Sequence, residues 1–222
     1  ERIAVMGFSM GGLATLLSSQ ERFRTRYGPT DVQFAAYIAL YASYPARLRD
    51  DVKVAARPIR LYHGTGDDWT TAAQCRALIE DLKKAGADVT MTEYSGATHG
   101  YDDPSFKVRL NFAGAFSVRN CSLAEGDGGQ IINSQTGKPF APSDPCIEKG
   151  VSLQYDEAAT ASTREAVKAV LTSAFAAKPA AAAETKAASP SLPKNVQMVQ
   201  PDPSLPKELA AFSGKWEGSG YD

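Results

Sequence analysis

Short apolar runs alternate with segments of helical periodicity through the first part of this chain, and this alternation limits the folds open to it. The apolar runs, each of the length of one buried strand, are 2–6, 36–41, 59–63 and 89–94. Apolar side chains recur at helical spacing over 11–19 and 71–85, and Gly86 ends the second segment as a C-cap. Apolar strands that alternate with helices predict an α/β fold, with helices on both faces of a parallel sheet.

The sequence after the fourth apolar run gives weaker periodic signals. We expect Asp103 and Pro104 to open a helix that ends near Phe116, because proline is favoured in the first turn of a helix. Residues 117–155 lose periodicity and collect glycine, asparagine, serine, aspartate and proline, which predicts a long and mostly irregular segment. Helical spacing returns over 156–175 and predicts a last helix.

The composition changes after this predicted domain, which spans 1–176. Six of the 13 prolines fall within 179–206, beside a run of alanines. We therefore expect a linker at 177–206 rather than a packed element. Residues 207–222 carry aromatic side chains among glycines and resemble the first strand of a further module.

The composition itself is that of an ordinary globular protein. The chain has 222 residues, of which 43% are hydrophobic and 22% charged, and its formal net charge is −1. Because charges of one sign form no long run, neither nucleic acid nor an anionic membrane is expected as the main partner. No apolar stretch approaches the length of a membrane span. No cluster of ligands or phosphate cradle indicates a metal or an organic cofactor, and the oligomeric state is left open.

Residues 7–11 form the pattern G-x-S-x-G, and another glycine follows at position 12. An apolar strand precedes the pattern and a helix follows it, as required for a sharp strand-to-helix turn that exposes the serine hydroxyl. We therefore predict that Ser9 is a nucleophile and that the N–H of Met10, at a helix N-terminus, is an oxyanion donor. The alternative is an ordinary glycine-rich turn with a surface serine.

A nucleophilic serine needs a base, and the chain has two histidines. His63 ends an apolar run and is expected to be structural, whereas His99 lies in a glycine-bracketed loop after the fourth run. The acid should lie between serine and histidine in the chain, where Asp67 and Asp68 both qualify. Spacing does not choose between them, and the other one is expected to cap the following helix or to face solvent. The sequence thus predicts a Ser-His-Asp triad.

These segments resemble the dienelactone hydrolase family of the α/β-hydrolase superfamily. The matching stretches are Gly-Phe-Ser-Met-Gly-Gly at 7–12, His-Gly-Thr-Gly-Asp-Asp-Trp-Thr at 63–70 and Gly-Ala-Thr-His-Gly-Tyr at 96–101, with further matches as far as the helix expected near 156–175. The resemblance selects Asp67 as the acid, because the family's acid follows the strand-end glycine by three residues. It also implies a partial α/β-hydrolase fold, the C-terminal half of an eight-stranded sheet, with the N-terminal strands and the second oxyanion donor upstream of Glu1.

The best-known members of that family carry a cysteine where this chain has Ser9. The resemblance implies a hydrolase that cleaves a carboxylic ester or lactone through an acyl-enzyme. A peptidase or acyltransferase with the same triad, or a non-catalytic scaffold remnant, is the alternative. Because half of the sheet and one oxyanion donor are expected to lie elsewhere, we predict that the 222-residue chain alone is inactive and poorly folded.

Two of the three cysteines, Cys121 and Cys146, flank the segment expected to be irregular. A disulfide between them suits a periplasmic or secreted protein, which is favoured over a cytoplasmic one with two free thiols. Cys75 lies on the apolar side of a predicted helix and is expected to be a small core residue.

Overall fold

The computed structural model describes residues 3–28, 33–176, 197–198 and 216–217. The chain divides into two compact units, Glu1–Ala183 and Glu184–Asp222. In the second unit, β11 (Gln197–Met198) pairs with β12 (Trp216–Glu217) in antiparallel fashion. The expected linker and further module otherwise lie outside the described residues, so the domain boundaries at 176 and 206 stay predictions.

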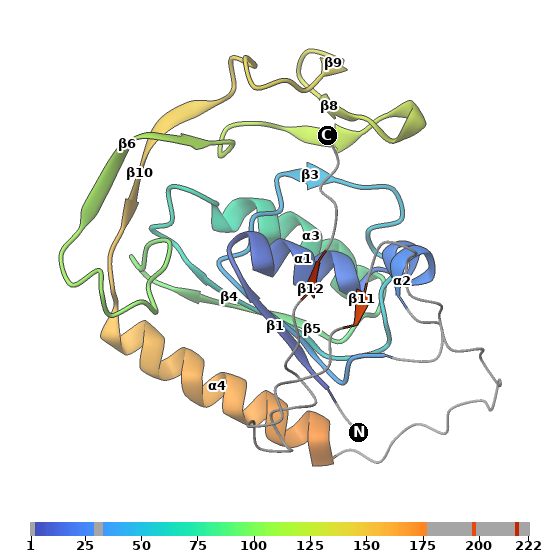
Figure 1. Ribbon diagram of the computed structural model, residues 1–222, viewed down its shortest axis with the longest axis vertical. Coiled ribbons are helices and arrows are strands. Elements are labelled where there is room, and N and C mark those ends of the chain that lie inside the picture. The colour runs from blue at the N-terminus through green and yellow to red at the C-terminus, as the bar shows by residue number, and fades with distance from the viewer. Residues whose placement is uncertain (1–2, 29–32, 177–196, 199–215, 218–222) are drawn as a thin grey trace. The chain divides into compact units, whose positions relative to one another are not determined.

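Four parallel strands form the centre of the first unit (Figure 1). In their order across the sheet, they are β1 (Val5–Phe8), β2 (Tyr37–Leu40), β4 (Ile59–Gly64) and β5 (Val89–Tyr94). All four residues of β2 are buried, as expected for a strand covered on both faces. The predicted α/β fold with a parallel sheet is therefore confirmed, and the four strand predictions hold within a few residues.

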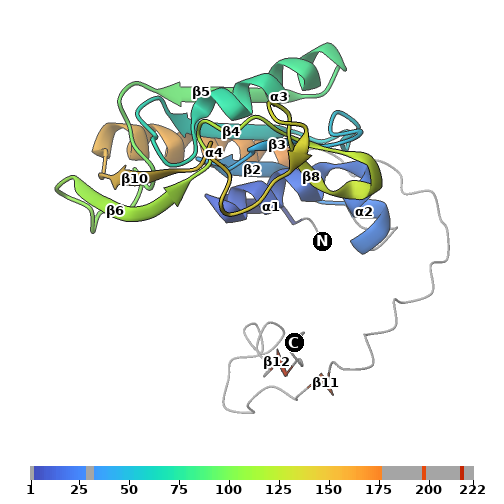
Figure 2. The same ribbon diagram turned by 90° about the horizontal axis from the view of Figure 1, so that it is seen from above.

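The helix expected from Asp103 to Phe116 is wrong. The structure has instead the strand β6 (Leu110–Ser117), which pairs in antiparallel fashion with β10 (Glu148–Leu153) to form a two-stranded ribbon (Figures 1 and 2). Apolar residues occur at every second position from Phe106 to Phe112, which is the period of a strand. This alternation outweighs the start signal of the Asp-Pro pair, whose residues lie in turns before the ribbon.

The segment expected to be irregular is also more regular than the prediction. It contains β7 (Leu123–Glu125), the short 3-10 helix η1 (Asp127–Gly129), β8 (Ile131–Asn133) and β9 (Lys138–Pro139). Together with β3 (Ala46–Arg47), the three strands form a second sheet in the order β3-β7-β8-β9. These strands are only two or three residues long, so none of them produces a periodic pattern that the sequence can reveal.

A disulfide joins Cys121 to Cys146 and closes a separation of 25 residues. Cys121 follows β6 and Cys146 precedes β10, so the bond ties the two strands of the ribbon together at one end. Cys75 is a free and fully buried thiol that belongs to the hydrophobic core, as expected.

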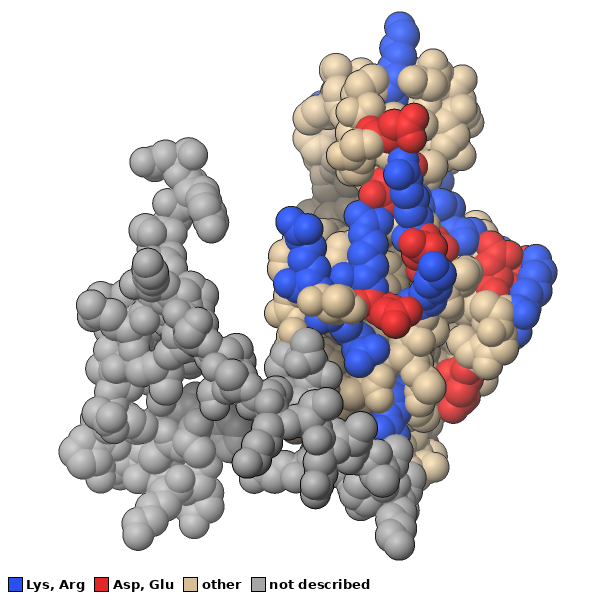
Figure 3. Space-filling model, turned by 90° about the vertical axis from the view of Figure 1, so that its right-hand side faces the viewer, with Lys and Arg blue, Asp and Glu red and all other residues tan. Residues whose placement is uncertain are grey.

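The helix α2 (Glu21–Tyr27) has no counterpart among the helices expected from the sequence. None of its seven residues is buried, so it has no apolar stripe by which it can be recognised. Arg22 of α2 is paired with Glu125 of β7. Figure 3 shows that positive and negative side chains are interspersed on the side of the molecule where α2 lies.

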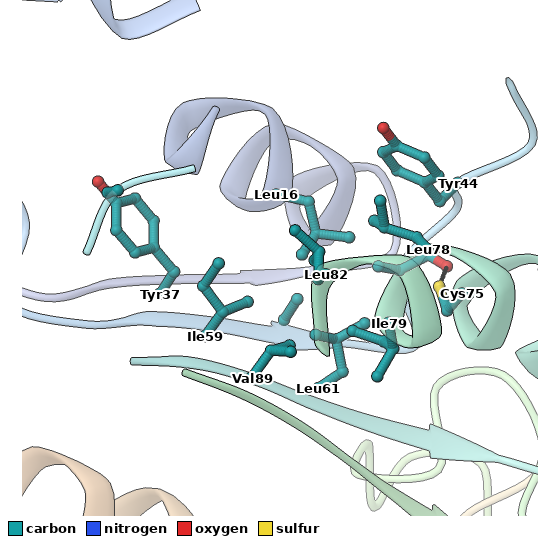
Figure 4. Close-up of a cluster of buried hydrophobic side chains, with 13 residues drawn as sticks. Leu16, Tyr37, Tyr44, Ile59, Leu61, Cys75, Leu78, Ile79, Leu82 and Val89 are labelled. Atoms are coloured by element: carbon teal, nitrogen blue, oxygen red, sulfur yellow. Dashed lines mark hydrogen bonds between the residues drawn. The ribbon is translucent and has the colours of Figure 1, made fainter. Parts of the chain in front are cut away.

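The two faces of the central sheet carry separate clusters of buried apolar side chains. On one face, α1 (Met10–Ser19) and α3 (Ala72–Lys84) pack on Tyr37 and Ala39 of β2 (Figure 4). On the other face, α4 (Glu157–Ala176) packs on Ile38 and Leu40. Each fully buried aliphatic side chain contributes on the order of 2 kcal/mol. The two clusters therefore hold the strands in place, and with them the loops that follow the carboxyl ends of the strands.

Candidate active site

Ser9 lies in the turn between β1 and α1, with a strained backbone. Its φ is 52° and its ψ −116°, a conformation that non-glycine residues rarely adopt and that occurs at functional sites. The turn is too tight for larger neighbours, since a Cβ on Gly7 would lie 2.0 Å from the carbonyl oxygen of Gly11. A Cβ on Gly12 would lie 2.9 Å from the side chain of Ala42. Close packing thus explains Gly7 and Gly12, whereas a Cβ on Gly11 would meet nothing within 4 Å.

His99 follows β5 in a loop that the sheet holds close to Ser9. Its Nε2 lies 2.8 Å from Oγ of Ser9, and its Nδ1 lies 2.9 Å from Oδ2 of Asp67. The imidazole is buried, with only 5% of the residue exposed. The structure therefore brings together three residues that follow three different parallel strands, in the chain order serine, aspartate, histidine.

Asp67 has a fully buried carboxylate with several donors around it. Oδ1 accepts hydrogen bonds from the backbone N–H groups of Trp69 and Thr70, at 2.9 and 2.8 Å. Burial alone would raise the pKa of Asp67, but hydrogen bonds from His63 and His99 outweigh burial and hold that pKa well below its usual range. The carboxylate is therefore ionised at neutral pH and can stabilise a positively charged imidazole.

Asp68 points to the ribbon instead of to the imidazole. Its two oxygens accept hydrogen bonds from the backbone N–H and the hydroxyl of Ser152, at 2.8 and 2.7 Å. The expectation that the second aspartate caps α3 or faces solvent is wrong, because β10 passes beside this loop. Of the two carboxylates that spacing left open, Asp67 is the one against His99.

Met10 is the first residue of α1, so its backbone N–H belongs to the first turn, where N–H groups have no partner within the helix. This N–H follows directly after Ser9. It lies at the N-terminus of the helix, where the helix dipole favours negative charge. The side chain of Met10 is 66% exposed and makes no core contact. Among the described residues, the N–H of Met10 is thus the backbone donor that directly follows the serine, as the sequence predicts.

Two aromatic rings flank the imidazole, and the sequence analysis assigned no role to either. The ring centroids of Tyr41 and Trp69 lie 4.8 and 5.1 Å from that of His99. The hydroxyl of Tyr41 donates to Asp102 at 2.7 Å, and Nε1 of Trp69 donates to the carbonyl of Phe116 at 3.0 Å. In the sequence, only their positions could have indicated these two residues, since Tyr41 follows a buried strand and Trp69 follows the acid.

Thr70 is another residue of the site that the sequence analysis did not single out. Its hydroxyl lies 3.0 Å from both Oδ2 of Asp67 and Nδ1 of His99, and 3.1 Å from the carbonyl of Tyr41. The hydroxyl therefore sits at the junction of the acid and the base. Its only sequence signal is its place three residues after the aspartate.

The part of the chain that the structure describes contains no group of histidine, cysteine, aspartate and glutamate side chains that fits a metal ion. Among the described helices, none combines the length and the apolar character that crossing a membrane requires.

Several solved structures are similar to this chain at low sequence identity. An α/β hydrolase enzyme from a Medee Basin deep-sea metagenome library is 14% identical with a TM-score of 0.43, over 78% of this chain and 55% of that one. A dienelactone hydrolase-like promiscuous phosphotriesterase from metagenomic libraries is 16% identical with a TM-score of 0.44, over 76% and 50%. A thermophilic esterase from Thermogutta terrifontis is 21% identical with a TM-score of 0.34, over 43% and 45%. The chain thus spans about half the length of the structures it matches.

No curated protein matches the chain. The sequence model of the dienelactone hydrolase family matches residues 1–120. This match covers more than half of the 222 residues and includes Ser9, Asp67 and His99. The chain belongs to the dienelactone hydrolase family.

Proposed function

We propose that this chain carries the nucleophilic part of a serine hydrolase, which cleaves a carboxylic ester or lactone through an acyl-enzyme. The observation that carries the proposal is the unbroken line of contacts from Ser9 through His99 to Asp67, at 2.8 and 2.9 Å. These distances are within hydrogen-bond reach for a nucleophile, its base and the group that orients the base.

In the proposed reaction, Oγ of Ser9 attacks the carbonyl carbon while Nε2 of His99 takes the hydroxyl proton. The negative charge that forms on the carbonyl oxygen is stabilised by the backbone N–H of Met10 and by the positive end of α1. When the tetrahedral intermediate collapses, His99 returns the proton to the leaving alkoxide, and the acyl group stays on Ser9. Water then repeats the same steps on the acyl-enzyme and releases the acid.

Asp67 holds the tautomer of His99 in which Nε2 is free to accept the proton, because its carboxylate faces Nδ1. Its low pKa keeps it charged while the imidazole becomes positive. Tyr41 and Trp69 limit the movement of the ring from two sides. The base therefore needs little rearrangement when a substrate arrives.

The ester or lactone substrate rests on the family, and the serine distinguishes this chain from the members with a cysteine nucleophile. A hydroxyl is a weaker nucleophile than a thiolate and depends more on its base. We therefore expect activity to depend strongly on His99 and on the ionised Asp67.

We further propose that the 222-residue chain alone is inactive and poorly folded. β1 is an edge strand of the sheet, and the side chains of Met6 and Phe8 on it are 40% and 42% exposed. An unpaired parallel edge with apolar side chains favours aggregation over a stable monomer. A cooperative melt and ester turnover by the isolated chain would contradict this proposal.

Covalent labelling by a fluorophosphonate probe, read by intact mass, tests the proposed nucleophile. The longest product of the source gene is treated beside the 222-residue chain, each with a Ser9→Ala variant as its control. We expect one probe per molecule on the long product and none on its Ser9→Ala variant. A folded long product that takes up no probe would instead support a non-catalytic scaffold.

A further inference from the structure

The second histidine of the chain lies behind the candidate triad. His63 is one residue from the end of β4, and its side chain is 1% exposed. Its Nε2 lies 2.5 Å from the carbonyl oxygen of Thr70 and 3.3 Å from Oδ2 of Asp67. The same carboxylate oxygen also faces Nδ1 of His99 at 2.9 Å. Asp67 is therefore shared by two imidazoles, of which only one reaches the serine.

The contacts of His63 determine which of its nitrogens carries a proton. A carbonyl and a carboxylate oxygen both accept hydrogen bonds, so Nε2 has to be the donor in this arrangement. Without such a donor, the carbonyl of Thr70 and the buried carboxylate of Asp67 would each lose a partner. An unsatisfied buried group of this kind is costly, and more so when it is charged.

The titratable groups around His63 come from three elements. Asp67 lies in the loop after β4, the thiol of Cys75 comes from α3, and Glu93 is the partner of His63 in the β5 register. Burial lowers the pKa of His63, but its interactions with Asp67 and Cys75 outweigh burial and raise that pKa above its ordinary value. The surroundings thus favour a histidine that holds its Nε2 proton at neutral pH.

We propose that His63 is a positioning residue for the acid of this site, with its Nε2–H donating to Asp67 and to the carbonyl of Thr70. The proposal rests on the proposed function and deepens it. The two contacts close the turn from 67 to 70 and keep Oδ2 of Asp67 charged and directed at His99. His63 itself touches neither Ser9 nor the reacting atoms, so it acts only through the aspartate.

Labelling rates over a range of pH test this role, because they need no identified substrate. The second-order rate constant of fluorophosphonate labelling is measured on the longest gene product and on two variants. His63→Leu removes the donor, and His63→Gln keeps an N–H group at a similar reach. We expect His63→Leu to slow labelling by about 10- to 100-fold at neutral pH, the range found for outer hydrogen-bond partners at metal sites. We expect His63→Gln to recover most of this loss.

The pH profile separates positioning from a merely structural role. When Asp67 loses the donor that helps to lower its pKa, its carboxylate takes up a proton at higher pH and no longer supports the base. The acidic limb of the rate profile should therefore move upward by about one pH unit in His63→Leu. Leu61→Ala serves as the matched control, because Leu61 is buried in the core on the same strand and its loss lowers stability without removing a donor. A profile of His63→Leu that keeps its shape, like that of Leu61→Ala, would overturn the proposal.

A double-mutant cycle adds a second readout. In an Asp67→Asn background, His63→Leu should slow labelling no further, since its effect passes through the carboxylate. An equal further loss in that background would also overturn the proposal.

The tautomer of His63 can be read in the wild-type protein, even where a variant at this position fails to fold. Long-range imidazole nitrogen correlations, assigned with His99→Asn, should show Nε2 of His63 protonated from pH 5 to pH 9. An unprotonated Nε2 would overturn the proposal. Absence of labelling at Ser9 in the wild type would reject the proposed function instead, and the nitrogen shifts would still test His63.

Discussion

The parallel sheet β1-β2-β4-β5 and the β6–β10 ribbon both reach the loop that carries the acid, but they are built differently. In the sheet, β2 is buried throughout and β4 has a single half-buried residue. In the ribbon, six of the eight residues of β6 are exposed. The ribbon is held to the loop by polar contacts, in which Ser152 donates to Asp68 and Arg119 donates to the carbonyl of Asp68 at 2.6 Å.

The difference shows that the sheet and the ribbon stabilise the site in different ways. Close packing of backbone and apolar side chains sets the positions of the serine, acid and base, which follow the carboxyl ends of β1, β4 and β5. The ribbon supports the outer side of the acid loop, where the hydroxyl of Ser117 donates to the carbonyl of Trp69 at 2.8 Å. We therefore expect damage to the sheet to abolish folding, and damage to the ribbon to loosen the acid loop.

Matched glycine substitutions in the two regions give the largest expected contrast. A Cβ on Gly64, at the end of β4, would lie 1.9 Å from the carbonyl oxygen of Ala97 in the loop that leads to His99. Gly64→Ala should therefore cost more than about 4 kcal/mol or prevent folding, at the extreme of point-mutant effects. Gly114→Ala in β6 is the control, since a Cβ there meets nothing within 4 Å, and it should change stability by less than about 0.5 kcal/mol.

Urea denaturation of the longest gene product measures both changes. If Gly64→Ala unfolds at the same urea concentration as the wild type, the loops at the strand ends are not closely packed. The proposed difference between sheet and ribbon would then be contradicted.

The same contrast explains which parts of the fold the sequence could predict. The buried strand β2 appears as an uninterrupted apolar run, and α3 buries Cys75, Leu78 and Leu82 at the helical spacing seen in the sequence. The ribbon produces a weaker pattern, because apolar residues alternate only from Phe106 to Phe112 and most residues of β6 are exposed. The Asp103-Pro104 pair then misdirected the prediction toward a helix, since a local start signal says nothing about the distant β10 strand.

For the candidate site, the sequence indicated the three residues of the proposed triad but not their surroundings. Ser9 lies in a tight strand-to-helix turn that requires a glycine at position 7, and chain order limited the acid to two residues. The contacts of Thr70, Tyr41 and His63 depend on how three loops meet at the end of the sheet. Such contacts join residues far apart in the chain, and neither periodicity nor spacing encodes them.

Removal of the disulfide should have an intermediate effect that is concentrated in the ribbon. Replacing Cys121 and Cys146 by serine opens a closed loop of 25 residues and should cost roughly 3 kcal/mol. We expect amide hydrogen exchange to become faster in β6 and β10 than in β2 or β4, because only the ribbon loses its tie. As a control, a Cys75→Ala variant is treated with reductant, so that the disulfide is opened in a protein without the buried free thiol. Equal acceleration in both regions would show that ribbon and sheet unfold as one unit.

The smallest expected effect concerns the ion pair between α2 and β7, which links the helices of the central sheet to the second sheet. Arg22 donates to both carboxylate oxygens of Glu125, and the backbone N–H of Arg49 donates to the same group at 3.0 Å. These contacts, the one from Arg22 above all, lower the pKa of Glu125 from 4.5 to about 2. Because the folded state holds this carboxylate ionised, the pair stabilises the fold above pH 4.5, and that contribution is lost as the pH falls toward 2.

Glu125→Gln should therefore cost about 1 kcal/mol at pH 7, since Arg22 is partly exposed, and close to nothing near pH 2. Urea denaturation of Glu125→Gln and of the wild type, at several pH values from 7 to 2, measures the difference in their free energies of unfolding. Glu165→Gln is the matched control, because Glu165 and its partner Lys168 are more than three-quarters exposed on α4 at a distance of 4.0 Å. A difference between Glu125→Gln and wild type that stays constant down to pH 2 would mean that the side chain contributes through packing. The link between the two sheets would then not depend on charge.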